Sequence, residues 1–324
     1  MKNDSIVSVI IPVFNEEKYI ESCIQSLISQ TYPRKHMEWL IIDGNSTDNT
    51  VEIVRTYAKH YPIHLLNNEE RKTPISMNIG IRHARGRYII RFDAHTAYPS
   101  NYIERCVYIL ENSDADNVGG FVETRADGFV GKAIAKILSS SFGVGGSRFR
   151  INSKGGYVDT VPFGAFRKEI FNKVGLFNEK LLRSEDNELN ARIRAMGGKI
   201  YLSSDIKSVY YCRDTVWGIL RMGLQNGNAL FRTIKENPKA MNIRHFIPFI
   251  FLISLIGMPV LGICMPVVYL LFVIEITLYL ILDIYFSFFT GSAKYGVITI
   301  WLYPLFHIFY GMGSLLGLFG IELY

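Results

Sequence analysis

The first hundred residues alternate between short apolar runs and segments with helical spacing. Residues 7–13 read VSVIIPV, a run rich in β-branched side chains that is typical of a strand buried on both faces of a parallel sheet. Between residues 16 and 30 the apolar positions recur at helical spacing, which predicts a helix. The alternation then predicts strands near 38–42, 63–66 and 87–92, with helices near 48–59 and 74–85. Strands that alternate with helices predict an α/β domain with a mostly parallel, doubly wound sheet.

Polar loops follow three of the predicted strands. They cover residues 14–16, 43–48 and 93–95, and each contains a carboxylate. In an open parallel sheet the ligand lies beyond the carboxyl ends of the strands, so these loops are the expected site. Asp93 and His95 offer a carboxylate and an imidazole that could hold a divalent cation on a diphosphate. The Asp-x-His spacing also occurs by chance, and its position after a buried strand favours the functional interpretation.

The end of the chain is strongly apolar in three consecutive runs. They cover residues 246–264, 266–289 and 296–320. At ~1.5 Å per residue, each can cross a hydrocarbon core of about 30 Å, which predicts three membrane spans. Little chain separates the first two runs, so a helical hairpin or a re-entrant piece at 259–266 is the alternative.

Charge divides the chain at the same place. The net charge of +6 is the balance of +8 over residues 1–245 and −2 over the remainder. Lysine and arginine are dispersed, which disfavours nucleic acid as a partner and favours membrane lipid and a phosphate-bearing substrate. The basic side chains that flank the apolar runs predict that both flanking loops are cytoplasmic, namely Lys235, Lys239, Arg244, His245 and Lys294.

Polar groups inside the apolar runs are few. Glu275 and Asp283 are expected to face protein or water, either as satisfied positions in a helix bundle or, alternatively, guiding a lipid acceptor. Together with His307 they are too few for the substrate path of a transporter.

The cysteines and the N-terminus carry little functional signal. Four scattered cysteines form no CxxC pair, which fits a reducing compartment. The apolar run near the N-terminus is too short for a signal peptide, so the front domain is expected in the cytoplasm.

Several ordered segments carry a family resemblance. VSVIIPVFNEEKYI, LIIDGNSTDNTVEIV and NIGIRHARGRYIIRFDAHTAYPSNYI resemble the family 2 glycosyltransferases with the GT-A fold. VDTVPFGAFRKEIF and GLFNEKLLRSEDNELNARIRAMGGKIYL are similar to the succinoglycan-type β-glucosyltransferase branch. The resemblance implies a GT-A catalytic domain over residues 1–235, a basic juxtamembrane segment over 236–245 and a membrane domain over 246–324.

The resemblance also assigns residues to the donor nucleotide. Pro12, Asn15 and Glu16 match the opening motif near the nucleoside. Asp43 matches the acid that hydrogen-bonds the base and ribose, usually of uracil. A carboxylate is a suitable acceptor for a uracil N3–H or for ribose hydroxyls.

By the same resemblance, four residues lie near the donor diphosphate. Arg71 is expected beside the phosphates, with Asn78 supporting that region, although an exposed loop arginine is equally often only solvated. Asp93 and His95 occupy the Asp-x-Asp position that holds Mn²⁺ or Mg²⁺. Imidazole suits Mg²⁺ less well, so the histidine leaves the metal preference open.

Catalysis is expected at the Glu-Asp motif. Asp186 matches the general base that takes a proton from the acceptor hydroxyl during inverting transfer, and Glu185 is expected to position Asp186 or the acceptor. A simpler reading is that both acids favour a helix N-terminus. Arg213 and Gln225 lie where relatives contact the diphosphate or the acceptor. Processive members carry a Gln-x-x-Arg-Trp signature in this region. Gln225 does not begin such a signature, which favours addition of a single sugar.

The sequence thus predicts a membrane-anchored, metal-dependent, inverting hexosyltransferase. Its donor would be a nucleotide diphosphate sugar, most simply a UDP-sugar. Its acceptor would be a membrane-associated, polyprenyl-diphosphate-linked saccharide in exopolysaccharide or cell-surface polysaccharide synthesis, with other polysaccharide assembly proteins as further partners. The alternative is a non-catalytic nucleotide-binding membrane subunit of such an assembly.

Overall fold

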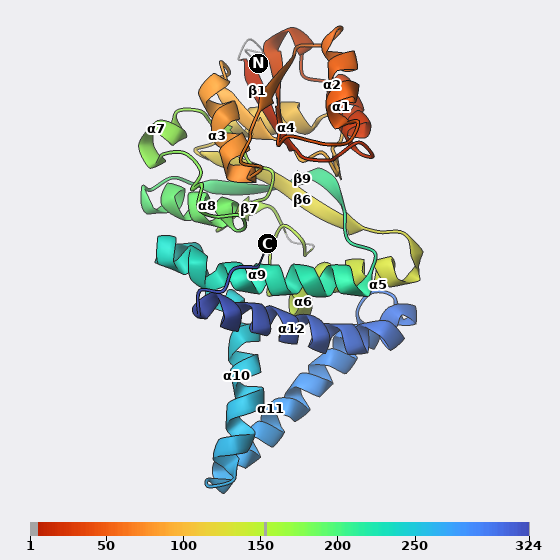
Figure 1. The fold of residues 1–324 in the computed structure, drawn as a ribbon, viewed down its shortest axis with the longest axis vertical. Helices are drawn as coiled ribbons and strands as arrows, with labels where there is room; N and C mark the ends of the chain where they lie inside the picture. The colour runs from red at the N-terminus through yellow and green to blue at the C-terminus, as the bar shows by residue number, and fades with distance from the viewer. Residues whose placement is uncertain (1–5, 152–153, 324) are drawn as a thin grey trace. The chain divides into compact units, whose positions relative to one another are not determined.

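The chain forms two compact units in a computed structural model that describes residues 6–151 and 154–323 (Figure 1). Unit 1 comprises Met1–Glu123 and Asn152–Tyr210, and unit 2 comprises Thr124–Ile151 and Tyr211–Tyr324. Unit 2 therefore includes segments before residue 235 that the sequence assigns to the catalytic domain. The limits of the functional domains stay a prediction.

Unit 1 contains the predicted parallel sheet. Strands β1 to β4 lie in the order β3-β2-β1-β4, and neighbouring strands run parallel. Their bounds are Val7–Val13 for β1, Met37–Asp43 for β2, Ile63–Asn67 for β3 and Tyr88–Arg91 for β4. Helices α1 (Ile20–Ile28), α2 (Thr50–Ala58) and α3 (Thr73–His83) connect them. The predicted alternation of strands and helices is confirmed.

Antiparallel strands extend this sheet beyond β4. Strand β8 pairs antiparallel with both β4 and β6, and β9 pairs antiparallel with β5 and β7. These strands are β5 (Thr96–Ala97), β6 (Asn117–Arg125), β7 (Gly156–Tyr157), β8 (Ala165–Arg167) and β9 (Ile200–Tyr211). Helices α4 (Tyr102–Asn112), α7 (Ile170–Val174) and α8 (Glu185–Ala195) complete the unit. Strand β4, helix α8 and the loops after β1 and β2 therefore all belong to unit 1.

The core of unit 1 explains why the strand ends are well defined. All seven residues of β2 are buried, and Val9, Ile10 and Ile11 of β1 are fully inaccessible. Continuous burial on both faces stabilises each strand by about 1.5–3 kcal/mol per large side chain. The loops that follow these strands are thereby held at fixed starting points.

Unit 2 is helical. It contains α5 (Gly128–Leu138), α6 (Ser141–Val144), α9 (Val216–Glu236), α10 (Ile247–Gly262), α11 (Pro266–Ile284) and α12 (Gly296–Leu318). Within this unit α9 and α12 lie side by side, and α10 and α11 form a hairpin (Figure 1).

Two apolar helical segments of the described chain are long enough to cross a membrane. They are Pro266–Phe289 and Ala293–Leu318. The first predicted span is the shorter α10, with 16 residues. Apolar helices at the predicted positions are confirmed, and a count of three spans stays a prediction.

The acidic residues of α11 face protein groups, as expected. Ser254 Oγ on α10 donates to Glu275 Oε1 at 2.7 Å. Asp283 is fully buried and accepts from Ser287 Oγ at 3.2 Å. Neither carboxyl group faces lipid alone, although Asp283 Oδ2 is buried without a hydrogen-bond partner among the described residues.

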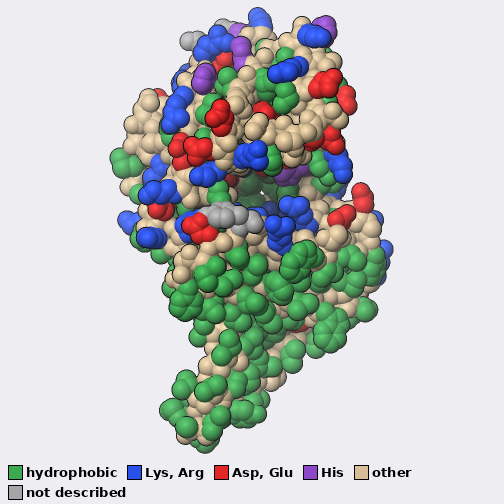
Figure 2. Space-filling view, in the orientation of Figure 1, with side chains coloured by type: hydrophobic (Ala, Val, Ile, Leu, Met, Phe, Trp, Pro, Cys, Tyr) green, Lys and Arg blue, Asp and Glu red, His purple; other side chains and the backbone are tan. Residues whose placement is uncertain are grey.

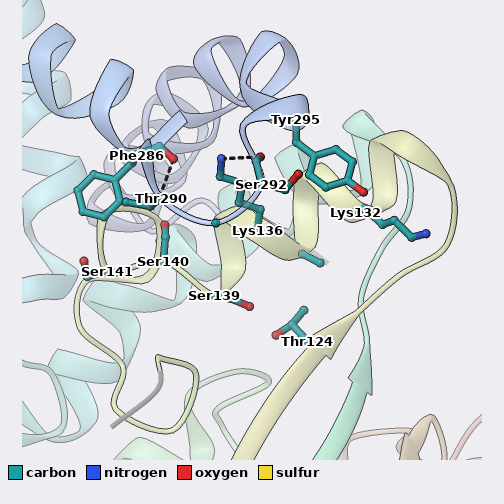
Figure 3. Close-up of a pocket in the computed structure, with 12 residues that line it drawn as sticks. Thr124, Lys132, Lys136, Ser139, Ser140, Ser141, Phe286, Thr290, Ser292 and Tyr295 are labelled. Carbon is teal, nitrogen blue, oxygen red and sulfur yellow. Dashed lines mark hydrogen bonds between the residues drawn. The ribbon is translucent and has the colours of Figure 1, made fainter. Parts of the chain in front are cut away.

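A cavity of about 460 Å³ lies within unit 2, between α5 and the segment that joins α11 to α12 (Figure 3). On one wall Lys136 Nζ donates to the carbonyl oxygens of Ser287 at 2.6 Å and Ser292 at 3.2 Å. Lys136 therefore ties this connection to α5. The residues that line this cavity do not include any of the predicted donor or catalytic residues.

Glycines bring the backbones of α9 and α12 into contact. A Cβ atom on Gly227 would lie 1.9 Å from the Tyr310 carbonyl oxygen, and one on Gly313 would lie 1.9 Å from the Leu224 carbonyl oxygen. Side chains cannot be accommodated at such distances, so both positions require glycine for helix packing.

Substitution of Gly227 by Ala should force α9 and α12 apart and lower the apparent melting temperature of the detergent-solubilised chain. Overpacking of this kind costs about 1–3 kcal/mol. Gly257→Ala is the matched control, because a Cβ there meets nothing within 4 Å, and it should be neutral or slightly stabilising. Equal melting temperatures for the two variants would contradict this description of the helix contact.

Candidate active site

The loops after β1 and β2 are joined by a network of hydrogen bonds. Asn15 has a φ of 54°, a left-handed conformation that asparagine tolerates better than most residues. Its backbone N–H donates to Ser46 Oγ at 2.9 Å, and its side-chain oxygen accepts from the Thr47 N–H at 2.8 Å. The Glu16 N–H donates to Thr50 Oγ1 at 2.8 Å. Asn15 therefore shapes the two loops.

Asp43 ends β2 at this network. Its side chain is largely buried and accepts from the Ser46 N–H at 3.2 Å on both carboxylate oxygens. Pro12, on the neighbouring strand β1, lies opposite Ile42 of β2. The structure brings Pro12, Asn15 and Asp43 together at one edge of the sheet, as the sequence predicts.

Arg71 reaches the same edge from the loop before α3. Its Cα is 3.6 Å from a Cβ built on Gly44, and its guanidinium lies 5.3 Å from the centre of the Phe14 ring. The side chain is exposed. A guanidinium that is held on an aromatic ring and open to water is suited to bind phosphate oxygens.

The side chain of Asn78 is occupied by hydrogen bonds to other protein groups. It is buried on α3, and its amide nitrogen donates to the Phe177 carbonyl at 2.9 Å and to Glu179 Oε1 at 2.8 Å. Its oxygen accepts from the Phe177 N–H at 2.9 Å. These bonds fix the segment before α8, and nucleotide contact by Asn78 stays a prediction.

The centre of the site is Arg91, which the sequence interpretation did not select. This buried side chain ends β4 and bonds three carboxylates. Its Nε donates to Asp93 Oδ1 at 3.1 Å, while Nη1 donates to Glu185 Oε1 at 3.0 Å and to both oxygens of Asp186 at 3.1 Å. One cation thus joins the strand-end loop to the first turn of α8. A charged residue inside the apolar run YIIRF was the signal that could have identified it.

The electrostatics of this cluster follow from three negative charges around one positive charge. Burial alone would lower the pKa of Arg91, but Asp186, Asp93 and Glu185 together raise it well above its ordinary value. Burial, with added repulsion from Glu185 and Asp93, raises the pKa of Asp186 to about 7 despite attraction by Arg91. A quarter of the Asp186 side chain is exposed, so an acceptor can reach it. A carboxylate with this pKa is suited to general base catalysis near neutral pH.

Buried amides hold α8 in place behind the cluster. Asn117 Nδ2 on β6 donates to Asn190 Oδ1 on α8 at 2.8 Å, and Asn190 Nδ2 donates to Thr160 Oγ1 at 2.8 Å. Buried hydrogen bonds between side chains favour one packing arrangement over others, although Asn117 Oδ1 itself is buried without a hydrogen-bond partner among the described residues. These two hydrogen bonds connect α8, which carries Glu185 and Asp186 in its first turn, to β6 and to Thr160.

The candidate metal ligands are two side chains. Asp93 uses only Oδ1 in its bond to Arg91, and His95 Nδ1 lies 3.3 Å from Glu16 Oε1. Across the described residues, no group of three or more His, Cys, Asp or Glu side chains is arranged to hold a metal ion. Asp93 and His95 fit a divalent cation whose other ligands are phosphate oxygens and water. Glu16 thus lies beside the candidate metal site as well as the nucleotide loops.

Two further predicted residues, Arg213 and Gln225, belong to unit 2. Arg213 is exposed before α9, and Gln225 is half-buried on it. Their contacts with diphosphate or acceptor stay predictions.

Comparison with known sequences connects this geometry with one family. The family described as "Glycosyl transferase family 2" matches residues 8–175. A Methanococcus voltae protein named "Dolichyl N-acetyl-alpha-D-glucosaminyl phosphate 3-beta-D-2,3-diacetamido-2,3-dideoxy-beta-D-glucuronosyltransferase" is 32% identical over 97% of both chains. The succinoglycan biosynthesis protein ExoA of Rhizobium meliloti is 33% identical over 66% of both chains.

Solved structures show the same fold. A mannosyltransferase from Pyrobaculum calidifontis, in complex with GDP-Man and Mn²⁺, has a TM-score of 0.63 and 17% identity, covering 98% of this chain and 88% of that one. Residues 1–349 of S. aureus TarS, in complex with UDP-GlcNAc, give a TM-score of 0.56 and 16% identity, with 98% and 93% covered. At these identities the likeness supports the predicted GT-A fold.

Replacing Arg91 by Met should destabilise the chain by about 3–5 kcal/mol, because three carboxylates lose their buried partner. Arg105→Met is the control, since its ion pair with Asp205 is largely exposed and is worth below about 1 kcal/mol. The loss for Arg91→Met should be smaller at about pH 5 than at about pH 8, because protonation relieves the repulsion. Thermal unfolding across pH measures both effects, and a loss independent of pH would contradict the charge argument.

Proposed function

Because the chain belongs to glycosyl transferase family 2, we propose that it transfers a sugar from a UDP-sugar to a polyprenyl-diphosphate-linked saccharide with inversion at the anomeric carbon. The reaction depends on a divalent cation, Mn²⁺ or Mg²⁺. Its product belongs to exopolysaccharide or cell-surface polysaccharide synthesis, and other assembly proteins are its partners there.

The observation that carries this proposal is the shared guanidinium of Arg91. It holds Asp186, the candidate base, within one hydrogen-bonded cluster with Asp93, the candidate metal ligand. Transfer needs a base on the acceptor side and charge neutralisation on the diphosphate side, close enough to act on one anomeric carbon. A single arginine between the two carboxylates meets this requirement.

The donor would bind along the edge formed by the first loops. Asp43 accepts hydrogen bonds from the uracil and ribose, beside Pro12 and Asn15. Arg71 binds the diphosphate oxygens, and Asp93 and His95 hold the cation. When bound, the cation neutralises negative charge that develops on the departing diphosphate.

Asp186 carries out the proton transfer. Its carboxylate accepts the proton of an acceptor hydroxyl as that oxygen forms a bond to the anomeric carbon. The bond from this carbon to the diphosphate oxygen breaks on the opposite face, which inverts the configuration. Glu185 and Arg91 orient Asp186, and Arg91 holds the proton-accepting carboxylate in place before substrate arrives.

The membrane acceptor is supported by the relatives and the apolar helices. The Methanococcus voltae relative is named for a dolichyl phosphate-linked substrate, and the Rhizobium meliloti relative for succinoglycan biosynthesis. The apolar helices keep the enzyme where a lipid-linked saccharide resides. The basic residues around them support a catalytic domain on the cytoplasmic face of the cell membrane, and we propose residues 1–235 as its limits.

A panel of UDP-, GDP- and TDP-sugars tests this function directly. Detergent-solubilised full chain with Mn²⁺ and a membrane lipid extract should release nucleotide diphosphate from one UDP-sugar, and product should form on the lipid fraction. If a nucleotide sugar binds but no nucleotide diphosphate is released with any of several membrane lipid extracts as acceptor source, a non-catalytic subunit would be favoured instead.

Replacing Asp186 by Asn should abolish transfer but preserve nucleotide binding, because the amide cannot accept the proton. In the unchanged chain kcat/KM should rise with pH and level off above about pH 7, since ionised Asp186 is the active form. Asp205→Asn, at an exposed ion pair, is the matched control and should keep both rate and profile. A rate that falls as pH rises through 7 would contradict the role of Asp186.

Replacing His95 by Asp should shift the metal preference from Mn²⁺ towards Mg²⁺, because Mg²⁺ prefers carboxylate oxygen to imidazole nitrogen. Metal titrations of UDP binding measure this without requiring turnover. Asp93→Asn is the comparison, and it should weaken binding with both ions. An unchanged preference in His95→Asp would show that His95 does not contact the metal.

A further inference from the structure

Helix α9 is poorly suited to hydrocarbon, because charged side chains are costly there. It carries four charged residues, one near its start and three near its end, and its buried positions lie on one face. The charged residues are Arg221, Arg232, Lys235 and Glu236. Such an amphipathic helix is suited to lie in the plane of a membrane surface, with its apolar face towards the other helices of unit 2 and lipid.

Helices α9 and α12 pack side by side and run parallel. Contacts advance along both helices in the same direction, because Gly223 meets Phe306, Gly227 meets Tyr310 and the Asn228 carbonyl meets Gly317. A Cβ on Gly317 would lie 2.4 Å from that carbonyl oxygen. The two helices are thus in backbone contact over several turns. If α9 lies in the surface plane, α12 lies in it too, although its composition suits a span.

The chain after α12 is bonded back to α9. Asn228 Nδ2 donates to the Ile321 carbonyl at 2.7 Å, and the Leu323 N–H donates to Asn228 Oδ1 at 3.2 Å. Arg232 forms an ion pair with Glu322. These polar contacts hold the described end of the chain beside the C-terminal half of α9.

The hairpin of α10 and α11 is the part suited to enter lipid. Its exposed side chains include Ile250, Ile256, Val260, Leu270 and Ile281, and hydrophobic side chains cover its visible face (Figure 2). Helix α10 is about 24 Å long at ~1.5 Å per residue, which is less than a hydrocarbon core of about 30 Å.

The tip of the hairpin satisfies its own backbone donors. The N–H groups of Ile263, Cys264 and Met265 donate to carbonyls of the preceding turn, and Pro266 has no N–H. The side chains of the tip carry no charge. A turn inside the bilayer must satisfy its polar backbone internally, whereas a turn in water has no such need.

From these contacts we propose that the anchor is an α10–α11 hairpin that enters and leaves the bilayer on one face, while α9 and α12 lie along that face. The partner surface is the lipid bilayer, and the hairpin tip ends within it. The described end of the chain then lies on the same face as α9, whereas three spans would place it on the opposite face.

Cysteine labelling with a membrane-impermeant maleimide tests this arrangement in the full chain. Ile321→Cys, at a half-exposed position, is placed in a Cys212→Ser, Cys264→Ser background, and intact cells are compared with inside-out vesicles. Cys23 and Cys106 are buried, and burial raises the pKa of both thiols, which keeps them unreactive. Lys59→Cys on unit 1 serves as the control for the catalytic side.

Ile321→Cys should react at least about tenfold faster in inside-out vesicles than in intact cells, as Lys59→Cys does, because thiol reaction requires access to the reagent. Faster reaction of Ile321→Cys in intact cells would overturn the proposal. If this variant does not accumulate, a cysteine on a short Gly-Ser extension after residue 324 gives the same two outcomes.

The natural Cys264 tests the depth of the tip. It is exposed on the protein, so only lipid can shield it. With Cys212→Ser as background it should remain unlabelled from both faces, and labelling from the outer face would overturn the claim that the tip ends in the bilayer. Neither measurement uses sugar transfer, so a failed topology leaves the proposed reaction intact.

Discussion

The buried guanidinium of Arg91 is the interaction on which the candidate site depends. Three carboxylates converge on it from a strand-end loop and from the start of α8. Without this cation, Asp93, Glu185 and Asp186 would repel one another in a site that is partly shielded from water. Burial, together with repulsion from Glu185 and Asp93, still raises the pKa of Asp186 despite this cation. The same interaction therefore positions the carboxylates and adjusts their chemistry.

Unit 2 illustrates a different constraint, the close contact of helix backbones. By composition α11 and α12 are both long apolar helices. Glycines at 223, 227, 313 and 317 let α12 contact α9, whereas α11 exposes most of its side chains. Apolarity alone makes a helix compatible with lipid, but packing decides which helix is available to enter it. The amphipathic partner of α12 is therefore as informative about membrane topology as its own sequence.

The loops proposed to bind the nucleotide and the candidate metal position differ in how far their side chains are held in place by hydrogen bonds. Asn15, Asp43 and Ser46 are joined by hydrogen bonds before a ligand binds, which reduces the entropy cost of ordering these loops on binding. Asp93 and His95 provide only part of a coordination shell, and His95 lies against Glu16. A cation held this way depends on the donor diphosphate, which would couple metal binding to substrate binding.

The sequence by itself determined the alternation of β1 to β4 with α1 to α3, and it identified the loops at Asp43 and Asp93, because buried parallel strands and polar strand ends have distinct local patterns. It also located Asp186, but through family resemblance. Only the tertiary structure decided that Arg91 joins these carboxylates and that the Asn78 amide hydrogen-bonds the backbone at Phe177. It likewise decided that α12 lies along α9. Those contacts join residues far apart in the chain, and their geometry depends on packing that local periodicity does not encode.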